Sequence, residues 1–175
     1  MFHSGTQRLI DLWSDLPDAG RIPMRADFDP VALGRVLPQA LIVDRGLDTL
    51  PVRLSGGWIE TLHGQPLKGL DWLGMWAFGS RPLVRASVTQ AFREARPVVL
   101  AAGAERMSGV IEIVIAPLRG PDGTADRVIG LYQWTRPADR AAKDVGELTA
   151  RMAVGVGPVG RAPLVLAAVN GRRVA

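Results

Sequence analysis

The glycine-rich segment at residues 155–160 carries the first pattern that could support chemistry. Its letters, GVGPVG, match the G-x-G-x-x-G spacing of a loop that holds a dinucleotide pyrophosphate. Such a loop works only where a strand enters it and a helix leaves it, because the helix aims backbone N–H groups at the phosphates. Here a weakly helical stretch precedes the glycines, and Arg161-Ala162-Pro163 follows them. The pattern therefore predicts a linker.

Metal chemistry has one candidate, the pair Asp27 and Asp29. A hard cation needs several further oxygen ligands, and the neighbouring sequence supplies none. Asp29 directly precedes Pro30, the arrangement typical of a helix N-cap followed by the first helical residue. The chain also has no cysteine, which excludes thiolate zinc sites, iron–sulfur clusters, c-type haem attachment and a cysteinyl flavin adduct. We therefore expect no metal site.

Acid–base chemistry would have to use Glu60 or Glu112 as a general base, and this is the enzyme alternative. Glu112 interrupts a run of isoleucines and is the one carboxylate that burial could shift. Period-two alternation argues against that role, because it turns Glu112 away from the isoleucine face. His63 is predicted to be a partly exposed residue at the end of a short helix. We expect no catalytic residue.

A different pattern favours an apolar binding site. Alternation in GVIEIVIAPL places the isoleucines on one face of a strand, and that face should meet the helices. The next strand adds Gly130, which leaves room, and Tyr132, whose hydroxyl offers one hydrogen bond. A filled core and an apolar cavity are equally compatible with this pattern. The predicted ligand-binding residues are Trp58, Leu62, Phe92, Ile111, Ile113, Ile115, Gly130 and Tyr132.

The first element that the periodicity predicts is a helix over residues 6–16. Its apolar residues are Leu9, Leu12, Trp13 and Leu16, which fall on one stripe. An exposed apolar stripe needs a partner surface. The helix is therefore expected either to cover the outer face of the sheet or to pair with its copy in a homodimer.

The remaining elements indicate an α+β fold. Two strands, several short helices, a helix over 80–96 and three strands follow one another, which predicts a five-stranded antiparallel sheet with helices across one face. We expect an N-terminal helical extension at 1–37, a core domain at 38–136 and a tail at 137–175. The tail is predicted to be weakly helical at first and then, from Gly155, flexible and basic.

Charge and hydropathy restrict the class of protein. The formal net charge is +4, and residues 136–175 contain seven basic and three acidic residues, so that the excess lies entirely in the tail. That tail is the basis of a nucleic-acid alternative, which is weak because no aromatic residues are interleaved with the charges. Apolar stretches are too short to cross a bilayer, and no signal-peptide layout is present. We expect a cytoplasmic protein that binds neither membrane nor nucleic acid.

Scattered single residues add a family resemblance. They are Trp13, the segment IPMRADFDP, the VLP at 36–38, Arg53, Gly56 and the segment HGQPLKG. Together with the order of elements over 38–136, they resemble the PAS domain, and more narrowly the bacterial subfamily known as PAS_5. The chain departs from that pattern at Ser55-Gly56-Gly57 and in the tryptophan-rich LDWLGMW.

The resemblance implies a single, non-enzymatic sensor or adaptor module. Its expected partner is a signalling protein, with a small apolar ligand as an optional modulator. Haem-binding relatives carry an axial histidine on the helix at 80–96, and this helix has none. Flavin-binding relatives usually carry a polar amide where this chain has the isoleucine strand. We therefore expect neither haem nor flavin as a cofactor.

Overall fold

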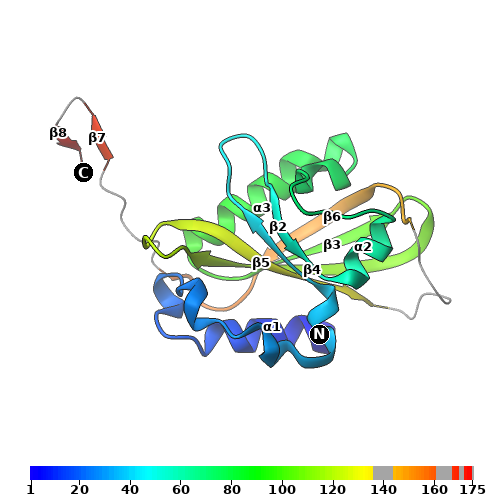
Figure 1. The fold of residues 1–175 in the computed structure, drawn as a ribbon, viewed down its shortest axis with the longest axis horizontal. Coiled ribbons are helices and arrows are strands. Elements are labelled where there is room, and N and C mark those ends of the chain that lie inside the picture. Colours follow the sequence, from blue (N-terminus) through cyan, green and yellow to red (C-terminus); the bar gives the residue numbers. More distant parts are fainter. Residues whose placement is uncertain (136–143, 161–166, 170–171, 175) are drawn as a thin grey trace.

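A six-stranded antiparallel sheet, with helices on both faces, organises the chain (Figure 1). In a computed structural model of the protein, residues 1–135, 144–160, 167–169 and 172–174 are described. The strand order is β2-β1-β5-β4-β3-β6, and β7 and β8 form a separate antiparallel pair. The fold is α+β, as the sequence predicts.

The elements have the following bounds. The α-helices are α1 (Ser4–Ser14), α2 (Gly57–His63) and α3 (Arg81–Glu94). The 3₁₀ helices are Ala19–Arg21, Arg25–Asp27, Pro30–Gln39, Trp72–Met75 and Phe78–Ser80. The strands are β1 (Ala40–Asp44), β2 (Val52–Ser55), β3 (Val98–Ala104), β4 (Met107–Arg119), β5 (Ala125–Trp134), β6 (Leu148–Gly155), β7 (Ala167–Val169) and β8 (Arg172–Val174).

The inner face of the sheet packs against α2, α3 and the 3₁₀ helix Trp72–Met75. Ile111, Ile113 and Ile115 on β4 are fully buried there, which is the face that the alternation predicts. Helix α3 contributes a buried stripe that includes Val88 and Phe92. This is the larger of two apolar clusters, and it contains the candidate site.

The outer face of the sheet packs against α1, which lies on the opposite side from α2 and α3 (Figure 1). Leu9 and Trp13 are buried among outward-facing residues of the two central strands, such as Val114 and Leu131. The Trp13 indole Nε1 donates a hydrogen bond to the Pro117 carbonyl at 2.7 Å. The sequence left two possible partners for the apolar stripe of this helix, the outer face of the sheet or a second copy of the helix. In the structure the stripe packs against the sheet.

The segment after α1 contains the helix whose start Asp29 and Pro30 indicate. Asp29 caps it as expected, since its carboxylate accepts a hydrogen bond from the Val31 N–H at 2.9 Å. The helix is 3₁₀ and runs to Gln39, with a kink at Gly34 where φ is +58°. Glycine tolerates that backbone conformation, so the chain turns here and continues into β1.

The main correction concerns β6, because the sheet has six strands where five are predicted. Residues 148–155 were expected to be a marginal helix, and they pair with β3 instead, with Val99 opposite Val154. Leu100 on β3 is fully buried, and an unpaired edge there would leave backbone N–H and C=O groups without partners. Gly146, at φ +71°, turns the chain into the strand. The sheet therefore extends past the predicted boundary at 136.

The GVGPVG segment is bound to the core rather than free. The Val156 N–H donates to the Pro97 carbonyl at 2.8 Å, and the Gly160 N–H donates to the Glu94 carbonyl at 2.7 Å. Residues 155–160 thus contact the core, the flexibility of the tail stays a prediction, and part of the remainder, including Arg161, lies outside the described residues. Among the described helices, none is long and apolar enough to cross a membrane.

Shortening the chain from its C-terminus tests whether β6 is needed for the stability of the sheet. A protein ending at Glu147 should lose its cooperative thermal transition, because the edge of β3 is uncovered and Leu148 leaves the core. A protein ending at Gly160 should melt within about 2 °C of the full chain, since a change well below 1 kcal/mol shifts the melting temperature only slightly. Circular dichroism measures both. Equal melting of the two truncated proteins would show that β6 does not support the sheet.

Candidate functional site

The predicted ligand-binding residues gather on the inner side of the sheet. Most are buried in the larger cluster: Leu62, Phe92, Ile111, Ile113, Ile115 and Tyr132. Trp58 is partly buried against the same cluster. Gly130 faces inward, because a Cβ placed there would lie 2.7 Å from Leu41 Cδ2. Ligand binding by these residues stays a prediction.

A chain of four aromatic rings runs through this cluster. The His63 and Tyr132 rings meet edge to face at 6.0 Å between centroids, and Trp72 and Trp76 meet in the same way at 5.5 Å. The two pairs are joined by a hydrogen bond of 2.7 Å from Trp72 Nε1 to the Tyr132 hydroxyl. Edge-to-face contacts align the positive edge of one ring with the negative face of the next. The arrangement fixes the direction in which each polar ring atom points.

Two polar atoms of this ring chain are buried without a partner. They are His63 Nε2 and Trp76 Nε1. A buried polar group that loses its water and gains no hydrogen bond costs roughly 1–3 kcal/mol. Most buried polar groups in folded proteins are paired with protein atoms or with ordered water, so the two atoms are exceptions to the usual pattern.

His63 is buried, which corrects the expectation of a partly exposed residue. Its side of α2 is covered because the Val145 N–H donates to the Leu62 carbonyl at 2.9 Å. Only 8% of the His63 surface remains exposed. Burial lowers the pKa of His63 from its ordinary 6.5 to about 4, and the nearby Asp144 carboxylate opposes part of that shift. The imidazole is therefore neutral near pH 7.

Tyr132 is also held in its neutral form. The residue is fully buried, and burial raises the pKa of the Tyr132 hydroxyl well above its usual range, although the hydrogen bond from Trp72 acts in the opposite direction. Neither ionisable member of the ring chain carries charge near neutral pH. The site is thus apolar and hydrogen-bonding in character.

The two carboxylates of the enzyme alternative lie elsewhere. Glu112 faces the outer layer, where its Oε2 accepts a hydrogen bond from the His3 backbone N–H at 2.9 Å. Glu60 accepts from the Ser55 hydroxyl at 2.6 Å and from the Leu67 N–H at 3.3 Å. Both side chains hold local structure together.

The other predicted sites can be placed as well. Leu9 and Trp13 are buried within the chain, while Leu12 and Leu16 are only partly buried against the outer cluster, so the homodimer through α1 stays a prediction. Asp29 serves as an N-cap, and the described residues contain no group of three potential metal ligands.

Sequence reasoning missed the polar atoms of His63 and Trp76. Trp72 and Trp76 are four residues apart, a spacing that favours one face of an α-helix. The structure uses a 3₁₀ helix at Trp72–Met75 instead, which leaves the rings perpendicular. No local signal marks His63 as buried, because the segment that covers it lies about eighty residues away.

The neutral, buried His63 predicts a pH dependence of stability. The unfolded protein takes up a proton near pH 6.5 and the folded protein only near pH 4, so stability should fall as pH decreases through this window, by up to about 3 kcal/mol. Urea unfolding from pH 7 to pH 4 measures the loss. His63→Gln should reduce that loss, and carboxylates common to both proteins cancel in the difference. Parallel curves for the two proteins would contradict the assignment.

The Trp72–Tyr132 hydrogen bond gives a second prediction. Tyr132→Phe should cost roughly 1–3 kcal/mol, because it leaves the Trp72 N–H buried and unpaired. In a double-mutant cycle with Trp72→Phe, the two changes should be less than additive in urea unfolding. Additive effects would mean that the bond contributes nothing to stability.

A comparison with protein families agrees with this architecture. A family model described as a PAS domain, PAS_5, matches residues 1–133. No curated protein matches the chain. A light-state structure of the LOV domain of the blue-light photoreceptor Aureochrome1 is 14% identical, with a TM-score of 0.45, and the match covers 57% of this chain and 82% of that one. A light-oxygen-voltage domain studied with a flavin analogue is 18% identical, with a TM-score of 0.42, and the match covers 55% and 76%.

These two solved structures are distant, so their chemistry is not transferred to this chain. The family match rests on a different basis, since it spans α1, the sheet from β1 to β5, and the helices between them. It also agrees with the resemblance that the sequence carries. The chain belongs to the PAS_5 family of PAS domains.

Proposed function

We propose that the chain is a sensory or adaptor module that binds a partner protein, and that a small, mostly apolar molecule bound among the core rings modulates this binding. The observation that supports it most directly is the pair of unpartnered polar atoms, His63 Nε2 and Trp76 Nε1, inside an otherwise apolar cluster. A ligand with one or two polar atoms on an apolar body would satisfy them.

The elements around the rings are suited to a change of population. Helix α2 has seven residues and the 3₁₀ helix Trp72–Met75 has four, and turns separate them. Short elements of this kind shift at lower cost than a six-stranded sheet. A ligand shifts the equilibrium between two arrangements of these helices only if it binds one of them more tightly than the other. The affinities differ if His63 Nε2 and Trp76 Nε1 point toward the ligand in one arrangement and away from it in the other.

Enzymatic function receives less support. General acid–base catalysis needs a titratable group beside the bound substrate with a pKa matched to the working pH. Glu60 and Glu112 are engaged outside the ring cluster, and His63 is neutral with a pKa of about 4. The nucleic-acid alternative is weakened too, because part of the basic tail is the strand β6.

The proposal predicts that freshly purified protein carries a small molecule. Mass spectrometry of the denatured protein should recover a compound in a ratio near one to one. Trp76→Phe should reduce its recovery, because the change removes the unsatisfied N–H; the ligand-free protein should also lose some stability, because the smaller ring leaves a gap at a fully buried position. Trp134→Phe, which alters a partly buried tryptophan outside the ring chain, is the matched control and should retain the compound.

A filled core would give a different result. Ile113→Trp should leave the melting temperature nearly unchanged if the ring cluster encloses a cavity, and should cost roughly 1–3 kcal/mol if it does not. An empty extract together with a strongly destabilised Ile113→Trp would exclude the ligand. The chain would then be an adaptor that binds its partner protein without regulation by a small molecule.

A further inference from the structure

A cleft lies away from the ring chain, at the end of the sheet where β1 finishes and β5 begins. It has a volume of about 390 Å³, which lies within the range of small-molecule sites. Three segments form its walls: the loop between β1 and β2, the middle of α3, and the start of β5. The lining residues are Arg45, Gly46, Leu47, Thr49, Leu50, Arg85, Val88, Thr89, Thr124, Ala125 and Asp126.

The cleft is apolar at its base and cationic at its rim. Leu50 and Val88 are buried members of the larger cluster, so the surface they present to the cleft is aliphatic. Arg45 and Arg85 come from separate segments, the β1–β2 loop and α3, and both line the opening. A site of this kind matches an amphiphilic anion, whose charged head meets the arginines while its apolar body covers the base.

Arg45 is the cation best placed to accept an anion. Its guanidinium lies 4.8 Å from the centre of the Phe92 ring, a contact that orients the group without neutralising it. Its backbone N–H donates to the Asp126 carbonyl at 2.6 Å, which ties the loop to β5. Among the described residues, no carboxylate lies within ion-pair distance of Arg45.

The positive charge of Arg85 is only weakly offset by a neighbouring carboxylate. Its Nη2 donates to the Asp48 carbonyl at 2.6 Å, and its Nη1 lies 3.9 Å from the Asp48 carboxylate. The Asp48 side chain is 97% exposed, so water screens most of that attraction. An incoming carboxylate can compete with it at low cost.

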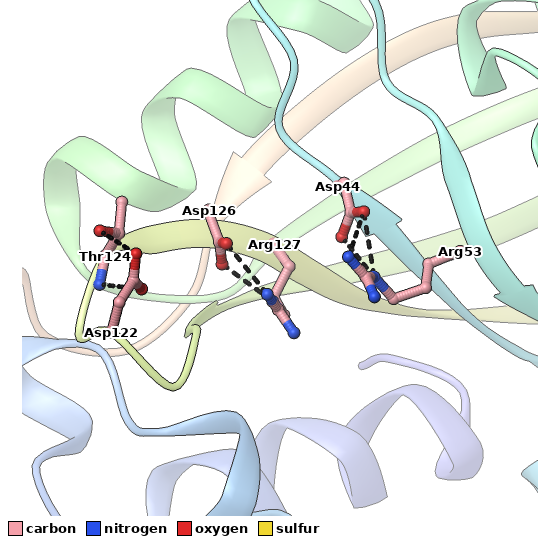
Figure 2. A network of polar contacts seen from close by, with 6 residues as sticks. All are labelled: Asp44, Arg53, Asp122, Thr124, Asp126 and Arg127. Atoms are coloured by element: carbon pink, nitrogen blue, oxygen red, sulfur yellow. Dashed lines mark hydrogen bonds and ion pairs between the residues drawn. The ribbon is translucent and has the colours of Figure 1, made fainter.

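Three other carboxylates near the cleft are already engaged, as Figure 2 shows. Asp122 accepts hydrogen bonds of 3.0 Å from the Thr124 N–H and hydroxyl and keeps its negative charge. Arg127 binds Asp126 through two hydrogen bonds of 2.8 and 2.9 Å, and Arg53 binds Asp44 in a similar two-pronged contact. Each of these pairs is neutral as a unit, so neither offsets the charge of Arg45. Among the residues that line the cleft, two arginines, Arg45 and Arg85, stand against one carboxylate, Asp126, so the rim has an excess of positive charge.

We propose that this cleft binds a small aliphatic carboxylate, with the carboxylate on Arg45 and Arg85 and the chain against Leu50 and Val88. The occupied cleft would join the β1–β2 loop to α3 through the ligand. The inference does not rest on the proposed function, because the cleft is separate from the ring chain and shares no lining residue with it.

Titration of the full chain with hexanoate tests the proposal, with hexan-1-ol and hexylamine as controls of matched length at constant ionic strength. Amide chemical shifts should saturate with hexanoate, and the perturbed residues should lie around the cleft. Hexan-1-ol and hexylamine should bind at least about tenfold more weakly, because each lacks the charge that pairs with the arginines. Equal binding of the alcohol, or shifts confined to the ring chain, would overturn the proposal.

Variants separate this site from general electrostatic attraction. Arg45→Gln and Arg85→Gln should each weaken hexanoate binding about tenfold or more. Arg93→Gln, which removes the same charge from an exposed position further along α3, should leave it unchanged. Thermal melts confirm that the exposed substitutions leave the fold intact. Equal weakening by all three variants would show attraction to net charge alone and would overturn the site.

Discussion

Burial of the central hairpin on both of its faces is the constraint on which this fold depends. Along β4, Ile113 and Ile115 point to one side while Val114 and Ala116 point to the other, and all four are fully buried. A strand of this kind is stable only with a layer on each side. Helix α1 is therefore part of the folding unit rather than an appendage, because it supplies the second layer.

The inner layer differs from the outer one in what it contains. The outer layer combines apolar side chains with an indole whose N–H is satisfied by Pro117, and it also contains one buried hydroxyl without a partner, Thr6 Oγ1. The inner cluster contains four linked rings, and two of their polar atoms have no partner. They are the feature of the inner layer that stability alone does not explain.

The parts of the fold that depend on local contacts or on a regular hydrophobic pattern could be predicted from the sequence. The alternation of Ile111, Ile113 and Ile115 gave the correct inner face, and the stripe containing Leu9 and Trp13 identified α1. Strand β6 could not be found in this way, because what makes it a strand is the open edge of β3, about fifty residues away in sequence. The burial of His63 was missed for the same reason, since Val145 covers it.

The same distant segment positions both unpartnered ring atoms. Val145 bonds to the Leu62 carbonyl beside His63, and the Leu148 carbonyl accepts a hydrogen bond from the Ala77 N–H next to Trp76, at 2.9 Å. The Ala150 N–H adds a bond of 3.0 Å to the Ser80 hydroxyl at the start of α3. Residues 145–150 lie beyond the region that matches the family model, which ends at 133. The environment of the ring chain is thus fixed by a part of the chain that the family pattern does not include. A change in the pairing of β6 would reach the neighbours of His63 and Trp76 through two backbone hydrogen bonds, and the start of α3 through the bond to the Ser80 hydroxyl, without any movement of the central hairpin.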